Sequence, residues 1–139
     1  MHLKNRMKNG RAAALLPLLL AACAGMPAQP PEEIVEQRAQ ARWDAMLAGD
    51  YEAAHAFATP GHRSATSASD LEIEMRTRQV QYVSAEAVGA SCEASVCEAR
   101  VKLEYKVVKP VRGLPEWQSS GVDEEKWILT DGQWWYLPE

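Results

Sequence analysis

The sequence predicts an α+β fold in which three N-terminal helices pack on one face of a four-stranded antiparallel sheet. Between positions 35 and 58, apolar residues recur at steps of three and four, which is the period of an amphipathic helix. Between positions 97 and 107 they alternate with polar residues, as in a strand with one buried face. Because helical and strand patterns occupy separate parts of the chain, helices and sheet should form separate layers.

The first helix is expected to begin in the segment Pro30-Pro31-Glu32-Glu33 and to end at Gly49. Prolines fit the first helical turn, and acidic side chains there complement the positive end of the helix dipole. One side of the helix carries an apolar stripe made of Val35, Ala39, Trp43, Met46 and Leu47. A stripe with this spacing should face the sheet, so Trp43 is expected to lie in the core.

Two shorter helices should follow. Asp50 is placed to cap the second helix. The apolar side of that helix carries Tyr51, Ala54, Phe57 and Ala58. The segment Thr59-Pro60-Gly61 should stop it, and the small polar residues 64–69 are expected to form a loop. Asp70 should then cap a third helix, which carries Leu71 and Met75.

The strands are expected over residues 80–91, 97–107, 121–129 and 133–137. The first of them should be bulged near Gly89, and residues 93–96 should form the turn that follows. Residues 110–115 contain two prolines and a glycine and are expected to form a loop. Asp131-Gly132 favours a tight hairpin turn, so the last two strands should pair directly.

The N-terminus has the pattern of a secretory signal peptide. The first eleven residues carry four basic side chains and no acidic one, and an uncharged run from Ala12 to Ala22 follows. As a helix, this run would span roughly 16 Å, which is too short to cross a hydrocarbon core of about 30 Å. Pro17 would also interrupt a membrane-spanning helix.

The segment Leu20-Ala21-Ala22-Cys23 resembles the lipobox of bacterial lipoproteins. The resemblance implies that the Cys23 thiol receives a diacylglyceryl group, that cleavage occurs before Cys23, and that the new amine is acylated. Several acyl chains anchor a protein stably, whereas one chain binds a membrane only marginally. Ala24 stands where an aspartate would imply inner-membrane retention in that family, so the outer membrane is favoured. Translation could start at Met1 or at Met7.

The chain therefore divides into a signal peptide over residues 1–22, a lipidated cysteine and tether over residues 23–31, and one domain over residues 32–139. The full chain carries 15 basic and 19 acidic residues. Loss of the signal peptide removes four basic residues and leaves a formal charge of −8. An acidic domain is a poor partner for nucleic acid or for an anionic bilayer surface, so membrane contact should come from lipid alone.

Two cysteines remain after lipidation, Cys92 and Cys97. An even pair in an exported chain predicts a disulfide, and the expected turn over residues 93–96 places the two residues opposite each other. The mature histidines His55 and His62 lie outside any pattern of metal-ligand spacing. We therefore expect no metal site and no cofactor.

Two segments resemble nuclear-transport-factor-2-like domains. Residues 41–54 with residues 59–63 are similar to the opening helices of that superfamily, and residues 125–136 are similar to its last two strands. The resemblance implies that a curved sheet wraps around the helices as a cone, often with an apolar pocket at its open end. It does not imply one function, because the superfamily includes isomerases, dehydratases, transport factors and proteins without a known reaction.

Isomerases of this superfamily use an aspartate base and a tyrosine-containing oxyanion hole. The residues of these types in the chain are Tyr82, Tyr105, Tyr136, Asp44 and Asp70. None of them lies in a motif that matches the isomerases residue by residue, so no catalytic residue is assigned. Tyrosines on alternating strands are usually core residues.

The other polar residues also have ordinary structural explanations. His55 is expected to be partly buried and hydrogen-bonded, and His62 is expected to face solvent in a turn. Ser64, Ser67 and Ser69 lie near His62, but the sequence has no nucleophile elbow for a hydrolase. The acidic run 123–125 should form a solvated strand face.

Trp134 and Trp135 must point to opposite faces if both lie in a strand. One of them should lie in the core. The other is the best single candidate for an aromatic side chain that is exposed or contacts a ligand. Trp127 on the preceding strand is expected to be a second core anchor beside Trp43.

These features favour a membrane-anchored envelope lipoprotein with a small non-catalytic binding domain, whose partner protein or apolar ligand is unknown. A purely structural envelope component without a pocket is an alternative. A small pocket enzyme of the isomerase or dehydratase type is another. A buried carboxylate within hydrogen-bond reach of a tyrosine, facing an open cavity, would favour the enzyme.

Replacement of Cys23 by Ala tests the anchor. The Cys23→Ala chain should accumulate as a soluble or uncleaved product, because it lacks the thiol that carries the lipid. Fractionation of membranes and mass spectrometry of the N-terminus provide the measurement. A variant that is correctly cleaved and still membrane-bound would contradict the lipoprotein interpretation.

Overall fold

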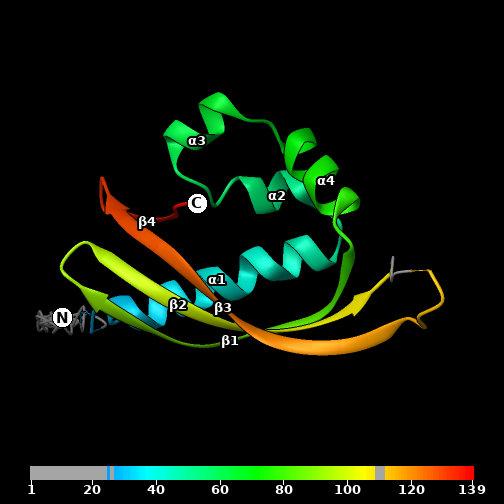
Figure 1. The fold of residues 1–139 in the computed structure, drawn as a ribbon. Helices are drawn as coiled ribbons and strands as arrows, with labels where there is room; N and C mark the ends of the chain where they lie inside the picture. Colours follow the sequence, from blue (N-terminus) through cyan, green and yellow to red (C-terminus); the bar gives the residue numbers. More distant parts are fainter. Residues whose placement is uncertain (1–24, 26, 109–111) are drawn as a thin grey trace, which may run out of the picture.

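We describe a computed structural model that covers residue 25, residues 27–108 and residues 112–139 (Figure 1). Helices precede strands along the chain. The helices are α1 Pro31–Leu47, α2 Tyr51–His55, α3 Pro60–Ala65 and α4 Ala68–Thr77. The strands are β1 Val80–Glu93, β2 Val96–Val107, β3 Trp117–Thr130 and β4 Gln133–Tyr136. They form an antiparallel sheet in the order β1-β2-β3-β4, which confirms the predicted fold class. The predicted signal peptide and Cys23 lie outside the described residues.

Helix α1 lies along the curved sheet, against β1 and β2, and α2 to α4 form a second group of helices beyond it (Figure 1). The buried face of α1 contains the predicted residues Val35, Ala39, Trp43 and Met46. Leu47, at the end of the stripe, is exposed instead. Arg42 is also buried on this helix, although a charged side chain is rarely found in a core without a partner.

The structure corrects the prediction for residues 60–70. The segment predicted to be a helix stop and a loop contains α3, with Pro60 in its first turn and the Thr59 side chain accepting a hydrogen bond from the His62 backbone. Helix α4 then begins at Ala68 rather than after Asp70. Its cap is Ser67, and Ser67 and Asp70 bond reciprocally in a capping box.

The sheet confirms the predicted strand pattern. Alternate residues of β2 are buried, beginning at Cys97, and the pairing of β1 with β2 shifts between Ala87 and Ala90, at the predicted bulge around Gly89. Strand β3 begins at Trp117, four residues earlier than predicted. Asp131 and Gly132 both have positive φ angles, of 52° and 75°, as the tight turn requires.

Gln40 of α1 covers part of the free edge of the sheet. Its side-chain amide donates a hydrogen bond to the carbonyl oxygen of Ala85 and accepts one from the backbone N–H of Ala87, at 3.1 Å and 2.8 Å. The amide thus replaces the backbone groups of a neighbouring strand. An edge occupied in this way is a poorer template for pairing with another chain.

A disulfide joins Cys92 of β1 to Cys97 of β2, and the two residues are directly paired across the hairpin. The turn between them consists of Ala94 and Ser95, a shorter turn than the predicted one. Cys97 is fully buried among the core residues, so the bridge connects the hairpin end to the core.

Removal of the disulfide should leave the domain folded. The closed loop is short, so the Cys92→Ala/Cys97→Ala double variant should lose only about 2 kcal/mol of unfolding free energy. Denaturant unfolding followed by tryptophan fluorescence measures this loss, and reduction of the wild-type chain should give a similar one. The absence of a cooperative transition in the double variant would show that the bridge is essential to the fold.

Candidate functional site

Glu125 is a buried carboxylate in the centre of the domain, with only 2% of its surface exposed. The prediction that residues 123–125 form a solvated face is therefore wrong for Glu125, whereas Asp123 and Glu124 are exposed as predicted. Glu125 pairs with Ala99, which is a buried residue of β2, and it shares its face of β3 with Trp127. That two-residue spacing from a core tryptophan was the sequence signal for its burial.

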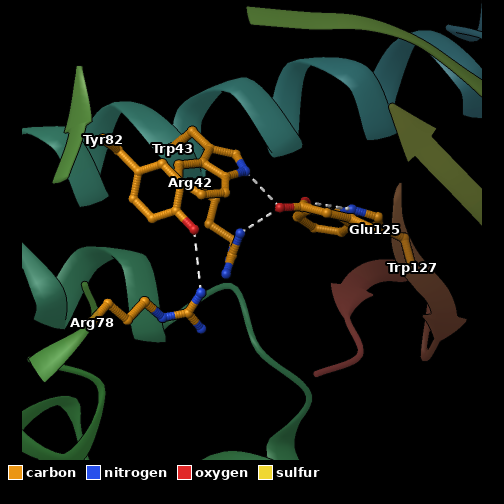
Figure 2. A network of polar contacts seen from close by, with 6 residues as sticks. All are labelled: Arg42, Trp43, Arg78, Tyr82, Glu125 and Trp127. Atoms are coloured by element: carbon orange, nitrogen blue, oxygen red, sulfur yellow. Dashed lines mark hydrogen bonds and ion pairs between the residues drawn. The ribbon is translucent and has the colours of Figure 1, made fainter. Parts of the chain in front are cut away.

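Three N–H donors surround the Glu125 carboxylate (Figure 2). Oε1 accepts hydrogen bonds from Nη1 of Arg42 at 2.5 Å and from the Trp43 indole N–H at 2.6 Å. Oε2 accepts a longer hydrogen bond, of 3.3 Å, from the Trp127 indole N–H. Arg42 is itself only 6% exposed, so the pair is a buried ion pair with further hydrogen bonds to its anion.

Burial raises the pKa of Glu125, since a low-dielectric environment disfavours the charged carboxylate. The charge of Arg42 and the indole hydrogen bonds act in the opposite direction. Burial also raises the pKa of Tyr136, whose ring lies 3.8 Å from the guanidinium carbon of Arg42. Arg42 thus contacts the carboxylate and stacks on a phenol ring at the same time.

The same residues lead to a second polar contact (Figure 2). The rings of Trp43 and Tyr82 meet edge to face, with their centroids 5.0 Å apart. The Tyr82 hydroxyl accepts a hydrogen bond of 3.2 Å from Arg78, and Arg78 forms an ion pair with Glu74 of α4. Residues of α1, α4, β1 and β3 are therefore linked through one chain of side-chain contacts.

A pocket of about 370 Å³ lies beside this network. Its volume is within the range of small-molecule sites. The apolar and aromatic lining consists of Trp43, Met46, Ala54, Ala58, Leu71, Tyr82, Leu103, Tyr136 and Pro138. The charged and histidine side chains that line it are Arg42, His55, His62, Asp70, Glu74, Arg78, Asp123 and Glu139. Glu125 does not line the pocket. It bonds to Arg42 and Trp43, which do line it.

The structure brings some of the sequence candidates together and separates others. Tyr82 and Tyr136 line the pocket, whereas Tyr105 does not. Asp70 lines it, but hydrogen bonds from Ser67 hold the pKa of Asp70 below its usual range. Asp44 lies on the exposed side of α1, where it accepts a hydrogen bond from Gln40.

Both histidines line the pocket. His55 is partly buried and bonded to Thr66 at 3.2 Å, which confirms its predicted environment. His62 was predicted to face solvent, and this is wrong, because α3 turns its ring to within 6.0 Å of the His55 ring, measured between centroids. Ser67 serves as the cap of α4, and Ser64 bonds to the Gly61 carbonyl oxygen.

Within the ranges that the structure describes, no group of three or more His, Cys, Asp or Glu side chains is arranged to hold a metal ion. None of the described helices has the length and apolar character needed to cross a membrane. Trp134 is buried and Trp135 is partly exposed, which confirms that one of the two indoles belongs to the core and the other does not.

Comparisons with known proteins bear on the fold. The chain is similar to the solution structure of a SEC-C motif containing protein from Rhodopseudomonas palustris, with a TM-score of 0.51 and 15% sequence identity over 70% of each chain. At this identity the likeness concerns the fold alone. No protein-family model and no curated protein matches the chain.

Glu125→Gln should change the pH dependence of stability. The raised pKa means that the folded protein binds this proton more tightly than the unfolded chain does. The contribution of Glu125 to stability is therefore fully present below its ordinary pKa of 4.5 and is lost as the pH rises through the raised pKa. The unfolding free energy of wild type minus variant should fall over this interval, as measured by denaturant titration at a series of pH values.

Glu124→Gln is the matched control, because it removes the same charge from an exposed neighbour. The difference in unfolding free energy between wild type and Glu124→Gln should stay nearly constant over the same pH interval. A rise of the wild-type minus Glu125→Gln difference with pH would mean that Arg42 and the indoles outweigh burial.

Proposed function

We propose that the chain is a cell-envelope lipoprotein, anchored by lipid on Cys23, whose domain binds a small amphipathic molecule without transforming it. The observation that carries the proposal is the pocket of about 370 Å³, whose wall includes an arginine fixed by a buried carboxylate. A concave site of this volume, in which oriented polar groups meet apolar and aromatic surface, can hold a small molecule. The presence of this pocket makes a purely structural component the weaker alternative.

The lining supports a ligand with an apolar body and a polar group. Met46, Leu71 and Leu103 provide aliphatic surface, and the rings of Trp43 and Tyr82 provide flat surface. The polar group would meet side chains that carry charges of both signs, so it should be a hydrogen-bonding or zwitterionic group rather than a strong anion or cation.

The arrangement does not favour catalysis. An isomerase of the expected type needs a carboxylate base that faces the cavity within reach of a tyrosine. Both oxygens of Glu125 are already acceptors for Arg42, Trp43 and Trp127. The pocket-lining Asp70 has a lowered pKa, which makes it a weak base. We therefore propose binding, with the isomerase or dehydratase as the alternative.

Location at the membrane is supported by the sequence. The basic segment, the short apolar run and Cys23 occur in the order of a lipoprotein signal, and Ala24 favours the outer membrane. The short tether then leads to α1, which begins at Pro31. We also propose membership of the nuclear-transport-factor-2-like superfamily, since the observed class of helices on a curved antiparallel sheet agrees with the quoted resemblance.

A pocket-filling variant tests the binding site. The uncharged fluorescent dye Nile red has an apolar aromatic body and a carbonyl group that accepts hydrogen bonds, so it is a suitable probe. Leu71 of α4 lines the pocket, and Leu71→Trp should occupy its volume and weaken probe binding about tenfold or more. Fluorescence titration of the folded variant provides the measurement.

Ile73→Trp is the control, because Ile73 lies on the same helix, is 61% exposed and does not line the pocket. This variant should bind the probe as the wild-type chain does. Equal probe affinity for Leu71→Trp and Ile73→Trp would contradict the pocket as the binding site.

A further inference from the structure

Two arginines from different helices lie close to one partly exposed indole outside the pocket. The guanidinium carbon of Arg38, on α1, lies 5.9 Å from the ring centroid of Trp135. That of Arg63, on α3, lies 4.8 Å from the same ring. Arg38 also lies 5.0 Å from the Phe57 ring and 5.8 Å from the Trp127 ring. None of these residues lines the pocket described above.

Neither arginine has an acidic partner among the described residues. The ion pairs found there join Arg42 to Glu125, Arg76 to Glu72 and Arg78 to Glu74. The Nε atoms of Arg38 and Arg63 are buried and have no hydrogen-bond partner among the residues that the structure describes. Burial lowers the pKa of Arg38, because a low-dielectric environment disfavours the charged guanidinium.

Such an arrangement is unusual in an acidic domain. Carboxylates are abundant, and a partly buried guanidinium normally forms an ion pair or several hydrogen bonds. Here, both guanidinium groups lie close to aromatic rings, and neither takes part in a hydrogen bond or an ion pair found among the described residues. The donors are thus positioned in advance for an external acceptor.

We propose that Arg38, Arg63 and Trp135 form a binding site for a phosphate group. The paired N–H donors of a guanidinium match the spacing of phosphate oxygens. Two guanidinium groups offer more N–H donors than one carboxylate can accept, which favours phosphate as the ligand. A phosphate monoester, with a charge of about −1.5 to −2 at pH 7, also has enough negative charge to compensate both cations, and a diester compensates one. The partly exposed Trp135 indole lies close to both guanidinium groups and so brings the two cations to one part of the surface.

The phosphate could belong to a lipid headgroup, as a diester with one negative charge, or to a free molecule with up to two charges. Both present phosphate oxygens that accept hydrogen bonds from the arginines. The site is separate from the pocket, so neither proposal depends on the other. A chain held on a membrane by Cys23 would encounter headgroups at high local concentration.

The test uses the full chain in micelles of a phosphate-free nonionic detergent, with inorganic phosphate as the probe at constant ionic strength. Phosphate should protect Arg38 and Arg63 from modification by phenylglyoxal, as measured by mass spectrometry of peptides. Arg76, which is exposed and paired with Glu72, is the internal control and should not be protected. This measurement needs no variant, so it does not depend on the folding of one.

Tryptophan emission provides a second readout. Phosphate should change it saturably, and Arg63→Met should weaken that binding about tenfold or more, because it removes one fork and keeps an apolar stem. Arg76→Met should leave the binding unchanged.

Vesicles that contain phosphatidylglycerol distinguish the two sources. Protection of Arg38 and Arg63 by these vesicles, without added phosphate, supports the site with a headgroup as its ligand. Protection by inorganic phosphate alone supports the site with a free phosphate compound as its ligand. If neither protects these two arginines more than Arg76, the proposal is overturned.

Discussion

The architecture depends on the hydrogen-bond donors that one buried carboxylate requires. Glu125 lies on the inner face of β3, and its oxygens are bonded to Arg42, Trp43 and Trp127. A charged group in this position is costly unless every lone pair finds a donor, and α1 provides two of the three donors. The network therefore fixes the rotation and position of α1 on the sheet more sharply than apolar contacts alone would.

The hydrogen bonds to Glu125 also order one wall of the pocket. Because Arg42 and Trp43 are held by Glu125, they present fixed surfaces to Tyr136 and Tyr82, which line the same pocket. A wall that is already ordered lowers the entropy lost when a ligand binds. The domain also has a second polar surface outside the pocket, where Arg38 lies close to the rings of Trp127 and Trp135. One buried arginine has a carboxylate partner, and Arg38 has aromatic rings instead.

The parts of the fold that depend on local sequence could be predicted. Residues that are neighbours in the chain determine three such features. They are the apolar stripe around Trp43, the alternation that begins at Cys97 and the Asp131-Gly132 turn. Helix α3 was missed because its start signals, Thr59 and Pro60, were interpreted as the end of α2. The burial of Glu125 could not be predicted from its acidic neighbours, because its main partner, Arg42, lies 83 residues away.

The central claim is that Glu125 and Arg42 act as a unit, and a double-mutant cycle with Glu125→Leu and Arg42→Met tests it most directly. Each single variant leaves one buried charge without its partner and should lose about 3–5 kcal/mol of unfolding free energy. The double variant removes both charges, so its loss should be much smaller than the sum of the two single losses. A double-variant loss equal to that sum would show that the two residues contribute independently and would contradict the account.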